Sequence, residues 1–280
     1  IALMAKQTRP LWDFEDIGDY WTRADEDAMV PCVAVPTTSG TGSEVGRCSI
    51  IVHEEERRKA IIFHPKMMPA RVVADPALTL GLPSKITAAV GMDALSHNLE
   101  AFCSPRYHPQ ADGIALEGMK LCKRSLINAF QDGSDISARS DMMAASLMGA
   151  TAFQKGLGAM HAMSHPLGAH LHVHHGLANA IVMPYVLVRN QDVIEDRMVE
   201  LARYLALEGT GTAAILQWVL DLRQKLGIPH TLASVGFEEK HCELLAPDSV
   251  KDPTAGGNPI LLSEQDYAEL FHNALHGILS

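Results

Sequence analysis

The feature that most constrains the fold is an abrupt change of pattern at Leu82-Pro83-Ser84. Before this point, short apolar runs separated by turn residues predict strands. After it, apolar residues recur only with helical spacing. Neither a single sheet nor a single helical bundle accounts for such a chain. We therefore predict a mostly helical α+β protein with two domains, residues 1–82 and residues 83–280.

The first part contains four predicted strands. Residues 31–36 and 71–75 are short apolar runs bounded by proline or Asp-Pro, which mark strand ends and turns. Residues 48–52 and 60–63 flank a charged segment, and this arrangement predicts a hairpin with a charged tip. The apolar residues 1–5 begin without a helix-start signal, so we expect them to be the end of a helix.

The second part is predicted to contain only helices. Ser84 is the predicted N-cap of the first one, because its hydroxyl can accept from a free backbone N–H. Turn sequences such as Gly209-Thr-Gly-Thr212 separate the helical segments. These segments are residues 86–102, 109–130, 136–153, 158–168, 177–188, 193–207, 212–226, 238–245 and 263–279.

Charge and composition exclude several partners. The formal net charge is −10, which argues against nucleic acid or an anionic membrane, since both require a basic surface. No apolar run approaches the roughly 18 to 20 residues of a membrane span. The five cysteines include no C-x-x-C pair. We expect them to be buried free thiols in a reducing compartment, the cytoplasm.

Histidine spacing indicates a metal site. Six of the fourteen histidines lie between residues 161 and 175, and such clustering is typical of metal binding. Asp93 and His97 lie four residues apart in a predicted helix, as do His161 and His165, so each pair shares one helix face. One carboxylate with several imidazoles is a ligand set that suits Fe²⁺ or Zn²⁺.

Spacing alone does not identify the ligands. An Asp and a His four residues apart are also common on solvated helices, and His170, His172 and His174 fit loop or surface positions better than ligand positions. The pattern does not separate His161 from His165, or His174 from His175. The ligand set therefore stays open on these grounds.

Longer motifs resemble those of the iron-dependent alcohol dehydrogenases. Residues 91–102, Gly-Met-Asp-Ala-Leu-Ser-His-Asn-Leu-Glu-Ala-Phe, resemble the first signature of that family. Residues 156–169, Gly-Leu-Gly-Ala-Met-His-Ala-Met-Ser-His-Pro-Leu-Gly-Ala, followed by His-Gly-Leu-Ala-Asn-Ala-Ile at 175–181, resemble the second. Gly-Asn-Pro at 257–259, before the last helix, is also typical. The resemblance spans the chain and implies a dehydroquinate synthase-like architecture.

The resemblance also implies a ligand set and a reaction. Asp93, His97, His161 and His175 match the four ligands of one divalent metal, Fe²⁺ with Zn²⁺ as the alternative. His165 matches a residue that is not a ligand but lies beside nicotinamide and substrate, where an imidazole can relay a proton. The implied reaction interconverts an alcohol and its aldehyde or ketone, with NAD or NADP as hydride carrier.

The cofactor contacts are implied in the same way. Pro36-Thr-Thr-Ser-Gly-Thr41 resembles the family's dinucleotide-binding loop, whose contacts are here Thr37 and Thr38. By itself, such a loop is most often a plain turn. Lys59 matches a lysine that reaches the cofactor, although it also belongs to a charged run. Leu80 is expected to flank the adenine or ribose.

One element of the family pattern is absent. The G-G-G-S phosphate-binding turn does not occur in this sequence, and we expect residue 1 to align just after it. On that basis, strands in residues 31–75 should have exposed edges. The 280-residue chain is expected to fold and bind metal with little or no activity.

Three alternatives remain at the level of sequence. The first is a dehydroquinate synthase-like or polyol dehydrogenase relative on the same fold, against which a fourth ligand at His175 argues. The second is a metal-dependent hydrolase, and the third is a metal-binding fragment without turnover. We expect a small-molecule alcohol or aldehyde as substrate and a homo-oligomer, a dimer, as the assembly. The sequence does not determine the alcohol or the choice between NAD and NADP.

Overall fold

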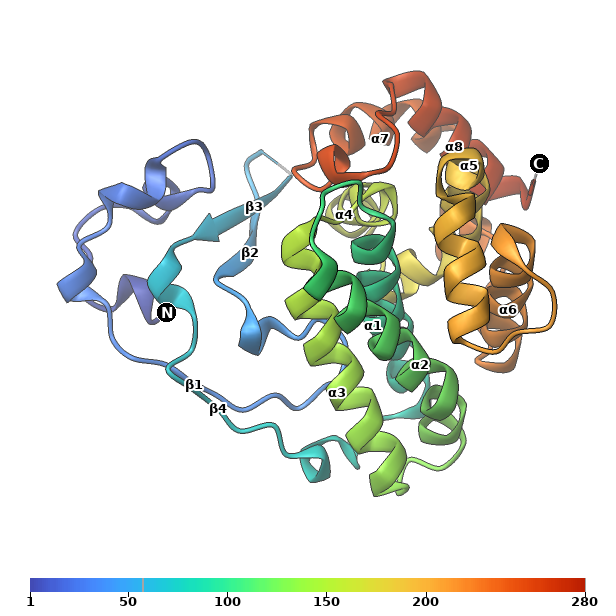
Figure 1. Ribbon diagram of the computed structural model, residues 1–280. Coiled ribbons are helices and arrows are strands. Elements are labelled where there is room, and N and C mark those ends of the chain that lie inside the picture. Colours follow the sequence, from blue (N-terminus) through green and yellow to red (C-terminus); the bar gives the residue numbers. More distant parts are fainter. Residues whose placement is uncertain (57, 280) are drawn as a thin grey trace.

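The structure is a computed structural model that describes residues 1–56 and 58–279 (Figure 1). Eight α-helices are present in these residues: α1 (Ser84–Cys103), α2 (Pro109–Gln131), α3 (Ile136–Ala152), α4 (Ala159–Leu171), α5 (His175–Tyr204), α6 (Gly211–Lys225), α7 (Lys240–Lys251) and α8 (Glu264–His276). The strands are β1 (Val33–Ala34), β2 (Cys48–His53), β3 (Arg58–Phe63) and β4 (Arg71–Val72). The predicted α+β, mostly α class is confirmed.

The strands form two separate two-stranded sheets. β2 and β3 are antiparallel, with Cys48 opposite Phe63 and His53 opposite Arg58, so the predicted hairpin is confirmed. Position 57, in its expected charged tip, lies outside the described residues. β1 and β4 are parallel neighbours and are shorter than the sequence predicts. In Figure 1 both sheets lie on the same side of the helical part.

The sheets leave apolar strand residues accessible. Val33 is 60% exposed and Val52 is 48% exposed. A small cluster of Leu3, Phe14 and Ile62 covers one side of the hairpin. These strands therefore bury few apolar side chains, and the main hydrophobic core lies in the helices.

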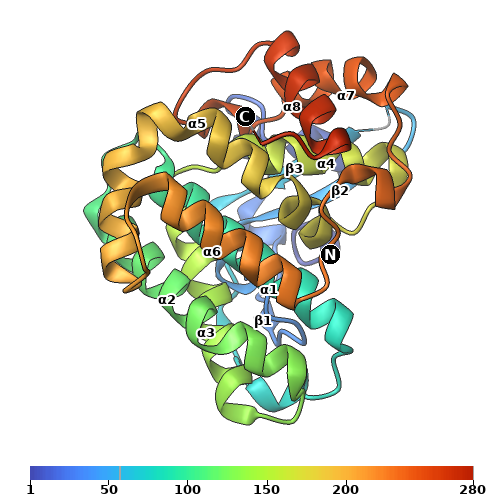
Figure 2. The same ribbon diagram turned by 90° about the vertical axis from the view of Figure 1, so that its right-hand side faces the viewer.

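The central element of the helical part is α1. It packs against α2, α3 and α5 (Figures 1 and 2). Ala94, Leu95 and Leu99 are fully buried, as expected for a helix that is covered on nearly all sides. Small residues allow this close packing: a Cβ on Gly91 would lie 2.1 Å from a methyl group of Leu126. Side chains on α1 are therefore held by surrounding helices.

The predicted break between residues 188 and 193 is wrong. α5 continues without interruption from His175 to Tyr204. The polar run at 189–192 suggests a loop, but Asn190 is buried and its amide exchanges two hydrogen bonds of 3.0 Å with the amide of Asn258. A buried polar contact, not a turn, explains these residues.

Other boundaries also differ from the prediction. α1 begins at Ser84 itself, with Pro83 in the cap position and no side-chain cap. α7 continues to Lys251, because Pro247 lies inside it without ending it. The first residues form a short 3₁₀ turn, Leu3–Ala5, and not the end of an α-helix.

Within the described residues, no helix combines the length and apolarity that crossing a bilayer requires. All five cysteines are free thiols, as predicted. The expected burial is wrong for two of them, because Cys48 is exposed and Cys32 is half-buried.

Candidate metal centre

The first two candidate ligands lie in α1. Asp93 and His97 are one helical turn apart, and both are nearly completely buried. The Nε2 atom of His97 lies 4.0 Å from Oδ1 of Asp93. Because α1 is enclosed by other helices, both side chains point into protein and not into solvent.

The other two candidates come from α4 and α5. His172 adopts a left-handed conformation (φ 56°) that ends α4 and lets the chain turn back into α5. His161 and His175 then face Asp93 with Nε2–Oδ1 distances of 4.0 Å and 3.6 Å. Gly176 makes this approach feasible, since a Cβ there would lie 2.2 Å from the carbonyl oxygen of Ala89.

The four ligand atoms fit a divalent metal ion. One atom each from Asp93, His97, His161 and His175 lies within 4.8 Å of the other three. A tetrahedral site with bonds of about 2.0 to 2.2 Å separates its ligand atoms by about 3.3 to 3.6 Å. The side chains need to move inward by less than about 1 Å, so the residues present suit an ion such as Fe²⁺.

The protonation states also suit a metal. Burial opposes ionisation of Asp93, but the three imidazoles and the Asn179 amide hold the pKa of its carboxyl at about 2. Burial lowers the pKa of His161 and of His175 well below the ordinary value. A carboxylate with neutral imidazoles is the state that coordination requires.

Neighbouring groups orient the candidate ligands. Glu100 bonds Nδ1 of His161 at 2.6 Å and accepts the Met160 backbone N–H at 2.7 Å. The Ser164 hydroxyl lies 3.2 Å from Nδ1 of His175. Each contact leaves Nε2 facing the centre, which is the usual arrangement around metal-binding histidines. The Asn179 amide donates to Asp93 at 2.9 Å.

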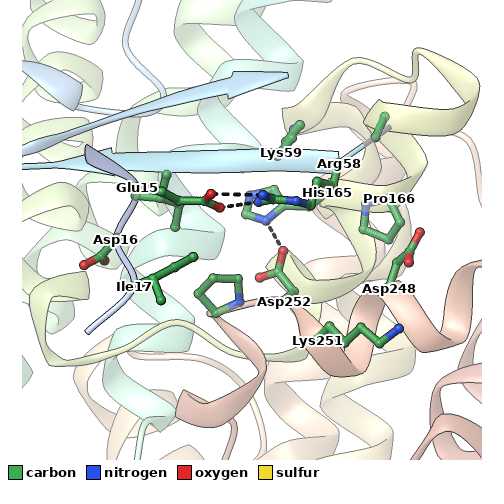
Figure 3. Close-up of a pocket in the computed structure, with 13 residues that line it drawn as sticks. Glu15, Asp16, Ile17, Arg58, Lys59, His165, Pro166, Asp248, Lys251 and Asp252 are labelled. Atoms are coloured by element: carbon green, nitrogen blue, oxygen red, sulfur yellow. Dashed lines mark hydrogen bonds and ion pairs between the residues drawn. The ribbon is translucent and has the colours of Figure 1, made fainter. Parts of the chain in front are cut away.

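His165 lies beside the four-residue cluster. It follows His161 by one turn of α4, and its ring stacks on that of His175 with 5.3 Å between centroids. Its Nδ1 lies 2.6 Å from Oδ2 of Asp252. Both residues line a cleft of about 300 Å³ (Figure 3). His165 therefore lies between the candidate metal site and the open cleft.

Charged residues of the strand region form the other wall of this cleft. Arg58 in β3 pairs with Glu15, and Lys59 is its neighbour (Figure 3). Lys59 also packs against α4, because its Nζ lies 3.2 Å from where a Cβ on Gly168 would be. Burial lowers the pKa of Lys59, while the charges of Asp252 and Asp93 act in the opposite sense.

The remaining cofactor candidates lie apart from His165 and Lys59. Thr38 lines a separate surface pocket, and Thr37 is exposed next to it. Their loop is held against α3 at Gly42, where φ is +63° and a Cβ would lie 2.5 Å from both Ala150 and the Ser146 carbonyl. Leu80 is 38% exposed. The structure therefore brings Lys59, but not the other three, into the cleft.

Comparison with known proteins agrees with this geometry. The model for the iron-containing alcohol dehydrogenases matches residues 1–76, and the model for the C-terminal part of the Fe-containing alcohol dehydrogenase family matches residues 87–275. The chain belongs to the iron-containing alcohol dehydrogenase family. The family of the predicted resemblance is thereby confirmed.

Named relatives point to the same reaction class. The chain is 40% identical to the 4-hydroxybutyrate dehydrogenase of Cupriavidus necator over 98% of its own length and 73% of that protein. A solved 1,3-propanediol oxidoreductase superposes with a TM-score of 0.91 at 32% identity, covering 98% and 72% of the two chains. The sulfoacetaldehyde reductase of Bifidobacterium kashiwanohense, solved with NAD⁺, gives 0.87 at 28% identity, covering 98% and 71%.

Membership in the iron-containing alcohol dehydrogenase family confirms the predicted oxidoreductase class. The reaction is the interconversion of an alcohol and its carbonyl compound, with iron and NAD as cofactors. The dehydrogenase interpretation is thus favoured over a lyase or a hydrolase.

Sequence reasoning missed three functional neighbours. Glu100 is three residues after His97 in the same motif, and Asn179 is four residues after His175 in one helix, so helical spacing could have indicated both. Asp252 is 87 residues from its partner His165. No local pattern signals that contact.

Proposed function

We propose that this protein reversibly oxidises a small primary alcohol to its aldehyde with NAD, using a metal held by Asp93, His97, His161 and His175. The observation that carries the proposal is one buried carboxylate and three imidazoles converging beside the His165–Asp252 pair at an open cleft. When both cofactors are bound, the ion would act as a Lewis acid toward the substrate oxygen, and NAD would accept the hydride.

The role we assign to His165 is to hold the proton of the alcohol. The Asp252 carboxylate bonds Nδ1, which fixes the ring and leaves Nε2 to accept a proton. Burial alone would raise the pKa of Asp252, but the hydrogen bond and charge of His165 and the contacts with Thr254 hold it below the ordinary value. The carboxylate therefore stays ionised and stabilises the imidazolium as it forms.

We predict that His165→Ala and Asp252→Asn lower turnover without removing the metal. The expected fall is about 100- to 10,000-fold for His165→Ala, which removes the proton acceptor. It is about 10- to 100-fold for Asp252→Asn, which removes only the carboxylate that orients the ring. Iron content by elemental analysis and NADH formation with 1-butanol are measured together. Loss of iron in His165→Ala would place His165 among the ligands and refute its assigned role.

The cofactor assignments extend the proposal to the strand region. We assign Lys59, in the same cleft as His165, and Thr37, Thr38 and Leu80, farther along the strand region, to the dinucleotide. In this arrangement residues 1–82 carry the cofactor side and residues 83–280 the metal side. We further propose a cytoplasmic homodimer that does not bind nucleic acid.

A second pocket supports an anionic substrate. It has a volume of about 380 Å³ and is lined by Arg47, Arg106 and Phe153, with Asp16 as its one acidic residue. The Phe153 ring lies 5.0 Å from that of His97, so this pocket adjoins the metal centre. 4-Hydroxybutyrate and sulfoacetaldehyde, named in two relatives, both carry an anionic group opposite the reacting carbon. We propose an ω-hydroxy acid whose carboxylate faces the two arginines.

This substrate class predicts a selective effect of Arg47→Ala. The KM for 4-hydroxybutyrate should rise about tenfold, because a hydrogen bond to a charged group contributes about 1.5 to 3 kcal/mol and exposure to solvent weakens it. The KM for 1-butanol should not change. Arg9→Ala, at an exposed arginine that pairs with Asp13, should change neither KM. Equal effects on both substrates would reject the ω-hydroxy acid while leaving the dehydrogenase assignment intact.

A further inference from the structure

A second group of metal-type ligands lies outside the catalytic cleft. His272 and His276 are one turn apart near the end of α8, and Glu239 directly precedes α7. α7 and α8 pack side by side (Figures 1 and 2). Thus two helices contribute to one surface position.

The three side chains already converge. Oε1 of Glu239 lies 2.8 Å from Nδ1 of His272, and Oε2 lies 2.8 Å from Nε2 of His276. The ring centroids are 4.5 Å apart. The three side chains are between 45% and 62% exposed, so an ion from solvent can reach them.

We propose that Glu239, His272 and His276 form a second, exposed binding site for a divalent transition metal. Zn²⁺ is the ion that this ligand set suits best. Two imidazoles and one carboxylate favour Zn²⁺ over Mg²⁺ or Ca²⁺, which prefer oxygen ligands. Two imidazoles at a spacing of four residues on one helix provide a rigid pair, and the carboxylate arrives from a different helix. Water completes the coordination of the ion.

The bound ion would hold α7 from one end. The opposite end of α7 contacts α4 through Asp248, which bonds His170 at 2.8 Å, and the next residue after the helix is Asp252, the partner of His165. Glu239 connects the start of α7 to α8 through its contacts with both histidines. A metal in this position therefore stabilises the α7–α8 pair and the helix that precedes Asp252.

The alternative is that the three residues form only surface ion pairs, which would bind no metal.

To test the proposal, tag-free protein is first loaded with iron at the catalytic site. It is then dialysed against micromolar Zn²⁺, and the bound ions are counted by elemental analysis. Wild type should hold zinc in addition to iron. Glu239→Gln, His272→Gln and His276→Gln should each lose the zinc and retain the iron, since glutamine keeps the hydrogen-bonding capacity of the surface.

Glu243→Gln is the matched control, because Glu243 is an exposed carboxylate one turn farther along α7. It should bind zinc like wild type. Zinc at 100 times its Kd should also raise the melting temperature of wild type by about 5 °C, and that of His276→Gln not at all. Wild type without bound zinc, or zinc that persists in all three variants, would overturn the proposal.

Discussion

His161→Ala is expected to abolish tight iron binding at the catalytic centre. The imidazole of His161 is buried between Asp93 and Glu100, so alanine removes one of the four candidate ligand atoms and leaves a gap in its place. Removing a residue that only hydrogen-bonds a ligand typically lowers metal affinity by about 10- to 100-fold. The loss of iron affinity in His161→Ala should be larger than this. Iron titration with elemental analysis of the dialysed protein measures it, and His175→Ala should behave in the same way.

Glu100→Gln is the graded control for this result. It keeps the shape of the side chain but removes its charge and replaces one accepting oxygen with an NH2 group. Glutamine therefore cannot accept from both the His161 ring and the Met160 N–H, as Glu100 does. Iron affinity should fall by about 10- to 100-fold, clearly less than in His161→Ala. If His161→Ala keeps the iron content of wild type, the assigned ligand set is wrong.

Gly176→Ala is expected to damage stability and metal binding together. The new Cβ would lie 2.2 Å from the Ala89 carbonyl oxygen and 3.0 Å from Cβ of Asp93, so α5 must move away from α1. Overpacking of this kind typically costs about 1 to 3 kcal/mol in the free energy of unfolding. The same movement separates His175 from Asp93. Urea unfolding and iron titration of one preparation measure both effects.

The matched control is Gly113→Ala in α2. Gly113 is exposed, and a Cβ there meets nothing within 4 Å. Alanine is the better helix former, so this variant should gain about 0.5 to 1 kcal/mol in unfolding free energy. Gly176→Ala with the stability and iron affinity of wild type would show that the contact between α1 and α5 does not position the ligands.

Local patterns predict most of the fold because they reflect which faces are buried. Helical periodicity predicts α1 to α4, α6 and α8, and two apolar runs around a charged tip predict the β2–β3 hairpin. The continuity of α5 was not predictable from local sequence. Asn190 suggests a loop because it is polar, but it lies inside the helix and bonds Asn258, which is 68 residues away. Likewise, Pro247 gives a stop signal that the surrounding packing of α7 overrides.

The candidate site likewise has features that local spacing predicts and features that depend on distant contacts. Spacing of four residues indicates that Asp93 and His97 share one face of one helix, which makes them a candidate pair without identifying them as ligands. It does not distinguish His161 from His165, whose difference arises from their distant partners Glu100 and Asp252. The resemblance to a family separates them where spacing cannot. The location of Lys59 in the His165 cleft depends on how β3 meets α4, which no local pattern describes.

The most direct test of the metal centre is anomalous diffraction at the iron edge from crystals loaded with one equivalent of iron. The account predicts one strong peak within bonding distance of a carboxylate oxygen of Asp93 and of Nε2 in His97, His161 and His175. His165 should remain bonded to Asp252 and outside the coordination sphere. A peak coordinated by His165 in place of His161, or no peak among these four residues, would contradict the central claim.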